Sequence, residues 1–129
     1  MDKILAEISA GELIDKITIL EIKKEKIRNK EKLVEVNKEL NSLNETLKKS
    51  IDNESKISSF KNDLKNINLK LWNIEDGKRD CERNGDFGEK FIQLARSVYI
   101  ENDQRAKIKN KINKISGSNI SEVKSYDQY

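Results

Sequence analysis

Residues 33–74, LVEVNKELNSLNETLKKSIDNESKISSFKNDLKNINLKLWNI, decide the fold. Leucine or valine recurs every three or four residues from Leu33 to Leu47, and apolar residues recur in the same way from Ile57 to Ile74. This spacing lines up the apolar side chains along one narrow seam of an α-helix, as in coiled coils. A polar turn, residues 50–55, separates the two seams. We therefore predict two helices folded into a long antiparallel hairpin.

A further helix should precede the hairpin. Ser9 followed by Glu12 is a capping box, so we expect this helix to begin at the next residue, Ala10. Its isoleucines and leucines fall on two opposite sides, which is typical of a helix buried between neighbours. The apolar stripe changes phase near Asn29, a good capping residue, which favours a break or kink before the first hairpin arm over a continuous helix with a stutter.

The second half of the chain should carry one more long helix. The second hairpin helix should continue to about Arg83, and Asn84-Gly85-Asp86 then turns the chain. Asp86 can cap a last helix that runs to about Ile115, because Gly117 is a typical residue after a helix end. The residues from 117 onward show no helical stripe.

These elements predict an all-α fold in one domain, residues 1–129. We expect an antiparallel helical bundle of about four helices, with a coiled-coil-like helical hairpin and a short non-helical C-terminal tail. The hairpin arms should span about 30–70 and the tail 116–129. The base of the hairpin should be formed by residues 9–28, 71–83 and 87–115.

The composition excludes several classes of protein. The chain has no histidine, which removes serine and cysteine triads and imidazole metal sites, and it has no glycine-rich phosphate loop. We therefore favour a protein that is not an enzyme. The net charge of +3 is weak, so a nucleic-acid partner is not favoured. A single cysteine, Cys81, and the lack of a signal peptide or long apolar run predict a cytoplasmic protein with no membrane segment.

Charged and polar side chains beside the predicted core are candidates for a binding site. Those that could hold an anionic ligand are Lys16, Arg79, Arg96, Tyr99, Asp103, Arg105 and Lys109. A second polar cluster consists of Glu12, Asp15, Glu75 and Asp76. The competing interpretation is a network of ion pairs that fixes the register of the helices. Glu12 and Asp15 lie three residues apart, which keeps Mg²⁺ open as a ligand, but we expect no cofactor and assign no metal ligands.

The sequence resembles a bacterial and phage family of unknown function. The resemblance rests on GELIDKITILEIK (11–23), LWNIED (71–76) with Arg79, FIQLARSVYIENDQRAKIKNKIN (91–113) and GSNISEVKSYDQY (117–129). It covers the chain except the hairpin, residues 30–65. It implies a gene neighbourhood of glycosyltransferases and surface-polysaccharide synthesis, and no catalytic residues.

Two functions remain open. The leading interpretation is a helical accessory or protein-interaction module linked to surface-polysaccharide biosynthesis, which binds a protein partner or self-associates as a homo-oligomer through exposed seams. The alternative is a small enzyme or binding protein for an anionic metabolite, phosphorylated or carboxylated. Its polar pocket would lie at the base of the hairpin.

Overall fold

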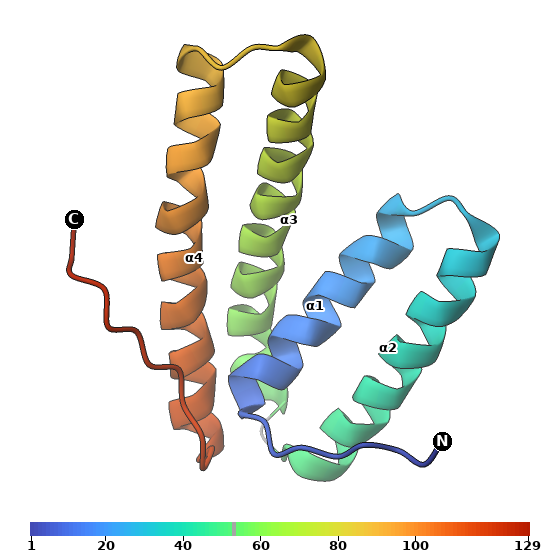
Figure 1. The fold of residues 1–129 in the computed structure, drawn as a ribbon. Coiled ribbons are helices and arrows are strands. Elements are labelled where there is room, and N and C mark those ends of the chain that lie inside the picture. The colour runs from blue at the N-terminus through green and yellow to red at the C-terminus, as the bar shows by residue number, and fades with distance from the viewer. Residues whose placement is uncertain (53) are drawn as a thin grey trace.

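The computed structural model describes residues 1–52 and 54–129 and contains four α-helices in this part of the chain (Figure 1). They are α1 (Ala10–Lys26), α2 (Lys30–Ser50), α3 (Glu54–Asn84) and α4 (Glu89–Ser116). The described residues form no β-strand. The residues before α1 and those after α4 form neither helix nor strand. The predicted all-α fold of about four helices is confirmed.

Local capping determines where the helices begin and end. The side chain of Ser9 accepts a hydrogen bond from the Glu12 N–H, and that of Asn29 accepts one from the Lys32 N–H, each at 3.0 Å. The predicted start of α1 and the predicted break at Asn29 are therefore confirmed. Gly117 ends α4 in the left-handed conformation, with φ 66°, which glycine adopts at low cost.

The cap predicted for α4 is wrong. The N-cap is Gly88, which offers no side-chain hydrogen bond, and the helix begins at Glu89. Asp86 instead accepts a hydrogen bond from the Gly88 N–H at 3.1 Å, closing a local turn two residues ahead of the cap. Aspartate forms such turns as readily as it caps helices, and the sequence did not distinguish the two roles.

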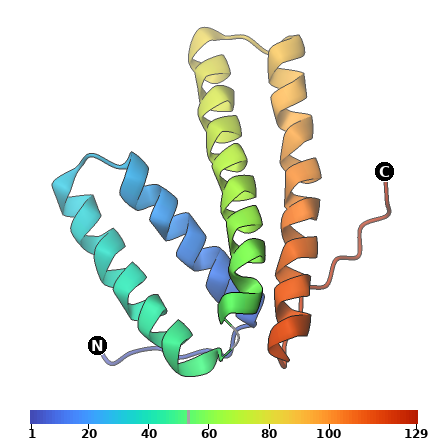
Figure 2. The same cartoon turned by 180° about the vertical axis from the view of Figure 1, so that it is seen from behind.

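The pairing of the helices differs from the predicted hairpin of residues 30–70. Within the described chain α2 and α3 do not run side by side; α1 packs against α2, α3 and α4, and α3 packs along α4 (Figures 1 and 2). The hairpins are therefore α1/α2 and α3/α4. The reason is that α1 is apolar on two sides, so each predicted seam packs on α1 and not on the other seam. The turn predicted at 50–55 includes Asn53, which lies outside the described residues.

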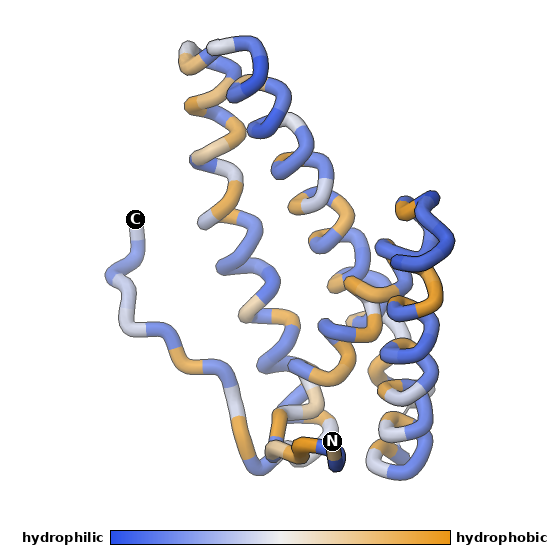
Figure 3. The backbone as a smooth tube through the Cα atoms, turned by 45° about the vertical axis from the view of Figure 1, so that its right-hand side comes forward, coloured by the Kyte–Doolittle hydropathy of each residue, from blue (hydrophilic) through white to orange (hydrophobic). Residues whose placement is uncertain are grey.

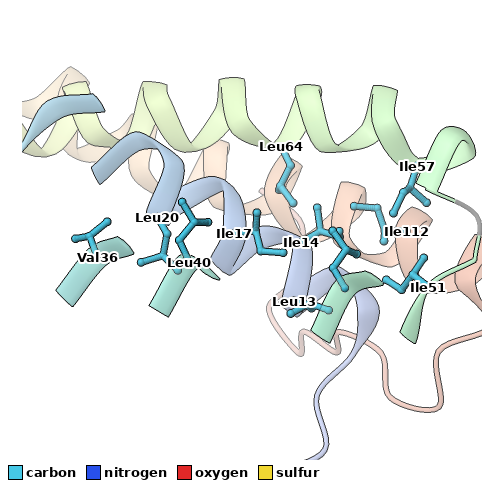
Figure 4. Packing of buried hydrophobic residues seen from close by; sticks show 11 residues of the cluster. Leu13, Ile14, Ile17, Leu20, Val36, Leu40, Ile51, Ile57, Leu64 and Ile112 are labelled. Atoms are coloured by element: carbon cyan, nitrogen blue, oxygen red, sulfur yellow. The ribbon is translucent and has the colours of Figure 1, made fainter. Parts of the chain in front are cut away.

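The core surrounds α1. Ile14 and Ile17 of α1, Leu64 of α3 and Ile112 of α4 are each 0% exposed, and all belong to one buried cluster (Figure 4). This placement confirms the prediction that the first helix is central. Complete burial of one such side chain contributes roughly 1.5–3 kcal/mol to stability.

The ends of α3 and α4 that are joined by their connecting loop extend past α1. Figures 1 and 3 show this two-helix extension, and hydrophobic residues recur along it. No described helix is long and apolar enough to cross a membrane. The extension lacks the cover that α1 gives to the rest of the α3/α4 pair.

Candidate functional site

A buried carboxylate, Asp15 of α1, lies at the meeting point of α1, α3 and α4. It is 1% exposed. The Arg105 guanidinium donates two hydrogen bonds to it, from Nε to Oδ1 at 2.9 Å and from Nη2 to Oδ2 at 2.5 Å. Asn68 Nδ2 donates a third to Oδ1 at 2.8 Å. A two-pronged guanidinium contact is the strongest arrangement available to a carboxylate, so Asp15 is fully satisfied by the chain itself.

A buried lysine, Lys109 of α4, lies next to this pair. Its Nζ is 2.6 Å from a Glu12 oxygen, 2.7 Å from a Glu122 oxygen and 3.9 Å from Asp15 Oδ2. The cluster thus holds three carboxylates and two cations. We name these five residues, Glu12, Asp15, Arg105, Lys109 and Glu122, the polar centre.

The charges of the polar centre hold its two cations in the protonated form. Burial by itself lowers the pKa of Lys109, but hydrogen bonds to Glu12 and Glu122 outweigh it, and the pKa is raised. The hydrogen bond to Asp15 raises the pKa of Arg105 in the same way. Neither group can therefore act as a proton acceptor near neutral pH, and neither is free to bind an external anion without leaving its carboxylate.

The C-terminal segment, residues 117–129, lies along α4. The Asn110 side chain accepts a hydrogen bond from the Glu122 N–H at 2.8 Å and donates one to the Glu122 carbonyl at 3.1 Å. Farther along, Lys124 donates to Asp103 at 2.9 Å, and the Tyr129 ring packs edge-on to Tyr99 with centroids 5.2 Å apart. The segment therefore runs antiparallel to α4 and adds Glu122 to the polar centre.

Two cavities adjoin the polar centre. The first, of about 370 Å³, lies between α1, α3 and α4; Ile19, Ile22 and Trp72 are among its lining residues. The second, of about 1150 Å³, is a groove between α4 and the C-terminal segment. Arg105 lines both cavities.

The structure distributes the predicted site residues between these cavities. Arg79, Glu75 and Asp76 line the first cavity, and Tyr99, Asp103 and Lys109 line the second. Lys16 and Arg96 are exposed on the surface and line neither of the two. Glu12 and Asp15 belong to the polar centre. The predicted residues therefore do not converge on one pocket.

The sequence did not indicate Glu122 of the polar centre, nor two asparagines that lie beside the centre. Asn68 donates to both Asp15 and Thr18, and Asn113 accepts a hydrogen bond from the Gly11 N–H at 2.6 Å. Glu122 was overlooked because its segment has no helical pattern. The one signal available was Asn68 beside the apolar seam, where a polar residue needs a buried partner.

The described residues contain no group of three or more acidic or cysteine side chains placed to hold a metal ion. Glu12 and Asp15 share one face of α1, as their spacing predicted, but each carboxylate is turned to a cation of α4. The arrangement therefore behaves chemically as a set of closed ion pairs that joins three helices and the C-terminal segment.

The fold and the polar centre define a class: an all-helical protein of four helices whose buried charges are paired within the chain. The chain belongs to the family of unknown function DUF6165, whose family model matches residues 4–129. The predicted resemblance to a family of unknown function is thereby confirmed. No curated protein and no solved structure matches the chain.

The contact between Asp103 and Lys124 gives a prediction for acid conditions. The hydrogen bond from Lys124, and after it one from Tyr129, lowers the pKa of Asp103 below its ordinary 3.8. A carboxyl group whose pKa is lowered in the folded state stabilises that state above its unfolded pKa, and this contribution disappears as pH falls through the folded value. We expect the end of the C-terminal segment to leave α4 below about pH 3.8.

Nuclear magnetic resonance of the Tyr129 ring measures this release. Asp103→Asn should release the segment already at neutral pH, whereas Asp127→Asn, a matched change in the same segment, should not. Unchanged Tyr129 signals in Asp103→Asn would contradict the contact.

Proposed function

We propose that this chain is a non-catalytic helical protein-interaction module. Its binding surface lies on the α3/α4 extension, on the side that faces α1 in the other half of the helix pair. We name this surface the distal face. The distal face consists of Trp72, Glu75 and Arg79 of α3 with Phe87, Phe91 and Val98 at and along the start of α4. The observation that carries the proposal is that α1 reaches only the part of this face near Trp72, and no other helix of the described chain covers the part around the α3/α4 loop, where Phe87 packs on Phe91.

Helical spacing shows that the distal face continues a packing surface. Arg105 faces α1, since it binds Asp15, and Val98 and Phe91 lie seven and fourteen residues before it on the same side of α4. On α3, Asn68 faces α1, and Glu75 lies seven residues beyond it. The side of the pair that packs on α1 in one half is therefore open in the other half.

The exposure of large side chains agrees with this. Phe87 is 54% exposed although it packs edge-on to Phe91, with ring centroids 5.5 Å apart. Ile92 on the adjacent side of α4 is 46% exposed. Helix stability in proteins comes mainly from packing of the apolar stripe against other elements. Two helices alone leave part of their apolar stripes exposed. Exposed large apolar side chains gathered at one end of a helix pair are typical of an interaction site.

The setting of this module is part of the proposal. The resemblance described above supports a place beside the enzymes of surface-polysaccharide synthesis, where an accessory protein would bring partners together. Cys81 is buried and unpaired, which supports a reducing compartment such as the cytoplasm.

A ligand-binding function is the second candidate, favoured by one observation: Tyr99, Asp103, Arg105 and Lys109 line the same groove. The charges work against an anion, because Arg105, Lys109 and Lys124 are already paired with carboxylates. If inorganic phosphate raises the thermal midpoint of the chain, and Lys124→Ala removes that rise, the groove is an anion site. We expect no rise.

The proposed interaction surface is tested by site-specific photocrosslinking in cells. A photoreactive amino acid at position 87 should give a crosslinked product, because Phe87 borders the distal face. The matched control is position 34, where Val34 is 65% exposed on α2, away from that face. A product from position 87 but not from 34 supports the proposal, and no product from 87 overturns it.

A further inference from the structure

We infer that the partner of the distal face is a second copy of this chain, placed antiparallel about a two-fold axis at the level of Gly77. This inference rests on the proposed function and names the partner of the same surface. The two α3/α4 extensions would then form one four-helix bundle, in which each helix covers the stripe left open by the other copy.

Charge placement about Gly77 is self-complementary. Glu75 and Arg79 lie two residues to either side of Gly77, and both line the first cavity, so they share one side of α3. When two α3 helices cross antiparallel at this level, Glu75 of one copy faces Arg79 of the other, and the same contact occurs a second time by symmetry. A two-fold interface requires this kind of reciprocal pairing.

The two side chains are available for such a contact. Within one chain Arg79 Nε is 3.8 Å from Glu75 Oε2, at the outer limit of an ion pair, and the side chains are 72% and 49% exposed. Glu75 Oε1 also accepts a hydrogen bond from Lys78 Nζ at 3.0 Å within the same helix, so only the Arg79 contact is loose; a contact of that length between exposed groups contributes little to stability. Exchanging it for the intermolecular contact therefore breaks nothing that the fold needs.

The remaining charges of the extension also fit a second copy better than a polyanion. Residues 72–98 carry six acids and five bases, mixed along both helices. Two surfaces of mixed sign can meet without repulsion, whereas a nucleic acid or an anionic membrane would need a basic face. Trp72 and Phe91 supply the aromatic side chains that are enriched at the centre of protein interfaces.

The size of the face sets the expected strength. The extension from residue 71 to 84 is about 20 Å long, and a pair of helices is roughly 20 Å wide, so each copy contributes on the order of 400 Å². The total of roughly 800 Å² lies below that of a standard stable interface. We therefore expect a reversible dimer with a dissociation constant in the micromolar range or weaker, which separates on dilution.

Charge reversal of the full-length chain tests the two-fold arrangement by sedimentation velocity. Glu75→Arg and Arg79→Glu alone each place like charges opposite each other twice, and each should weaken association at least tenfold. An equimolar mixture of the two variants should associate as well as the wild type, because every facing pair is then of opposite sign. The double variant E75R/R79E should also recover association. Both positions are exposed, so circular dichroism should show an unchanged fold.

The outcomes separate this inference from the proposed function. If the wild type associates but the mixture does not recover, the two-fold arrangement is overturned. If the wild type stays monomeric into the millimolar range while position 87 crosslinks to a protein of another mass, the interaction surface stands and the second copy is overturned. If neither association nor a crosslink occurs, both are overturned.

Discussion

Asp15→Ala is expected to lower the free energy of unfolding by about 3 kcal/mol, because it removes the carboxylate that pairs with Arg105. It also removes the most buried of the three carboxylates around Lys109, which keeps Glu12 and Glu122. The side chains of these two cations are only 28% and 9% exposed, so water can replace the lost carboxylate only in part. Asn68 also loses its acceptor Asp15 Oδ1. The partial exposure of Arg105 puts the expected loss at the lower end of the range for a broken buried pair. Urea denaturation measures it, and the thermal midpoint should fall by roughly 10 °C.

Glu21→Ala is the matched control for this change. Glu21 is also an acid of α1 that pairs across to α3, with Lys61 at 3.5 Å and Lys65 at 3.7 Å, but its side chain is 28% exposed. Its removal should cost less than about 1 kcal/mol. If Asp15→Ala proved as stable as wild type or more stable, Asp15 would be a strained functional group and not a structural one, since active sites are often stabilised when a functional charge is removed.

Gly11→Ala is expected to be of similar severity, at about 2–4 kcal/mol, because the site has no room for one additional carbon. A Cβ at this position would clash with the Lys109 carbonyl oxygen of α4 and lie 2.8 Å from Asn113 Oδ1. Backbone cannot yield as a flexible side chain can, so α1 and α4 must move apart. That movement also strains the 2.6 Å hydrogen bond from the Gly11 N–H to Asn113. The gain of about 1 kcal/mol in helix propensity from alanine is too small to compensate.

Gly88→Ala provides the control for this second change. Its Cβ would meet only Asp86 Oδ1, at 3.4 Å, and its φ of −82° suits any residue. Because Gly88 is the N-cap of α4, where alanine is disfavoured, the free energy of unfolding should fall by up to about 1 kcal/mol, less than at Gly11. Thermal denaturation of both variants distinguishes a close helix contact at Gly11 from a general intolerance of glycine replacement; equal midpoints for the two would argue against the close contact.

The starts of α1 and α2 could be predicted because their signals are local. Ser9 and Asn29 cap the helices that follow them, and each signal involves only residues within three positions. The central place of α1 was also readable, since isoleucines occur on two of its sides. The pairing of the helices could not be predicted, because an apolar seam with three-four spacing can pack against any complementary seam. In the described part of the chain the seam of α2 packs on α1 and not on α3.

The contacts of the polar centre could not be predicted from the sequence either, because they join residues far apart in the chain. The sequence analysis named Glu12, Asp15, Arg105 and Lys109 as candidates, but it placed the acids and the bases in separate groups. Arg105 lies 90 residues after Asp15, and no local pattern reports a contact at that distance along the chain. The structure favours the interpretation that competed with a ligand site, a network of ion pairs that fixes the helices. In such a network paired charges specify which helices meet.

Together these features separate the molecule into a structural half and a half with an open surface. The polar centre and the docked C-terminal segment tie α1, α3 and α4 together around the core. The α3/α4 extension has no such cover, and Phe87 at its end is exposed while Trp72 and Phe91 are half-buried. We propose that binding occurs on this extension and not in the groove beside the C-terminal segment.

The most direct test of this claim is an amide chemical-shift series of the wild-type chain recorded from micromolar to millimolar concentration. Shifts that depend on concentration should be confined to residues 71–98, with the side-chain N–H of Trp72 among them. Residues of the polar centre and the C-terminal segment should keep constant shifts. Changes centred on Tyr99 and residues 118–129 would contradict the claim, and constant shifts throughout the chain would overturn the second copy as the partner of this surface.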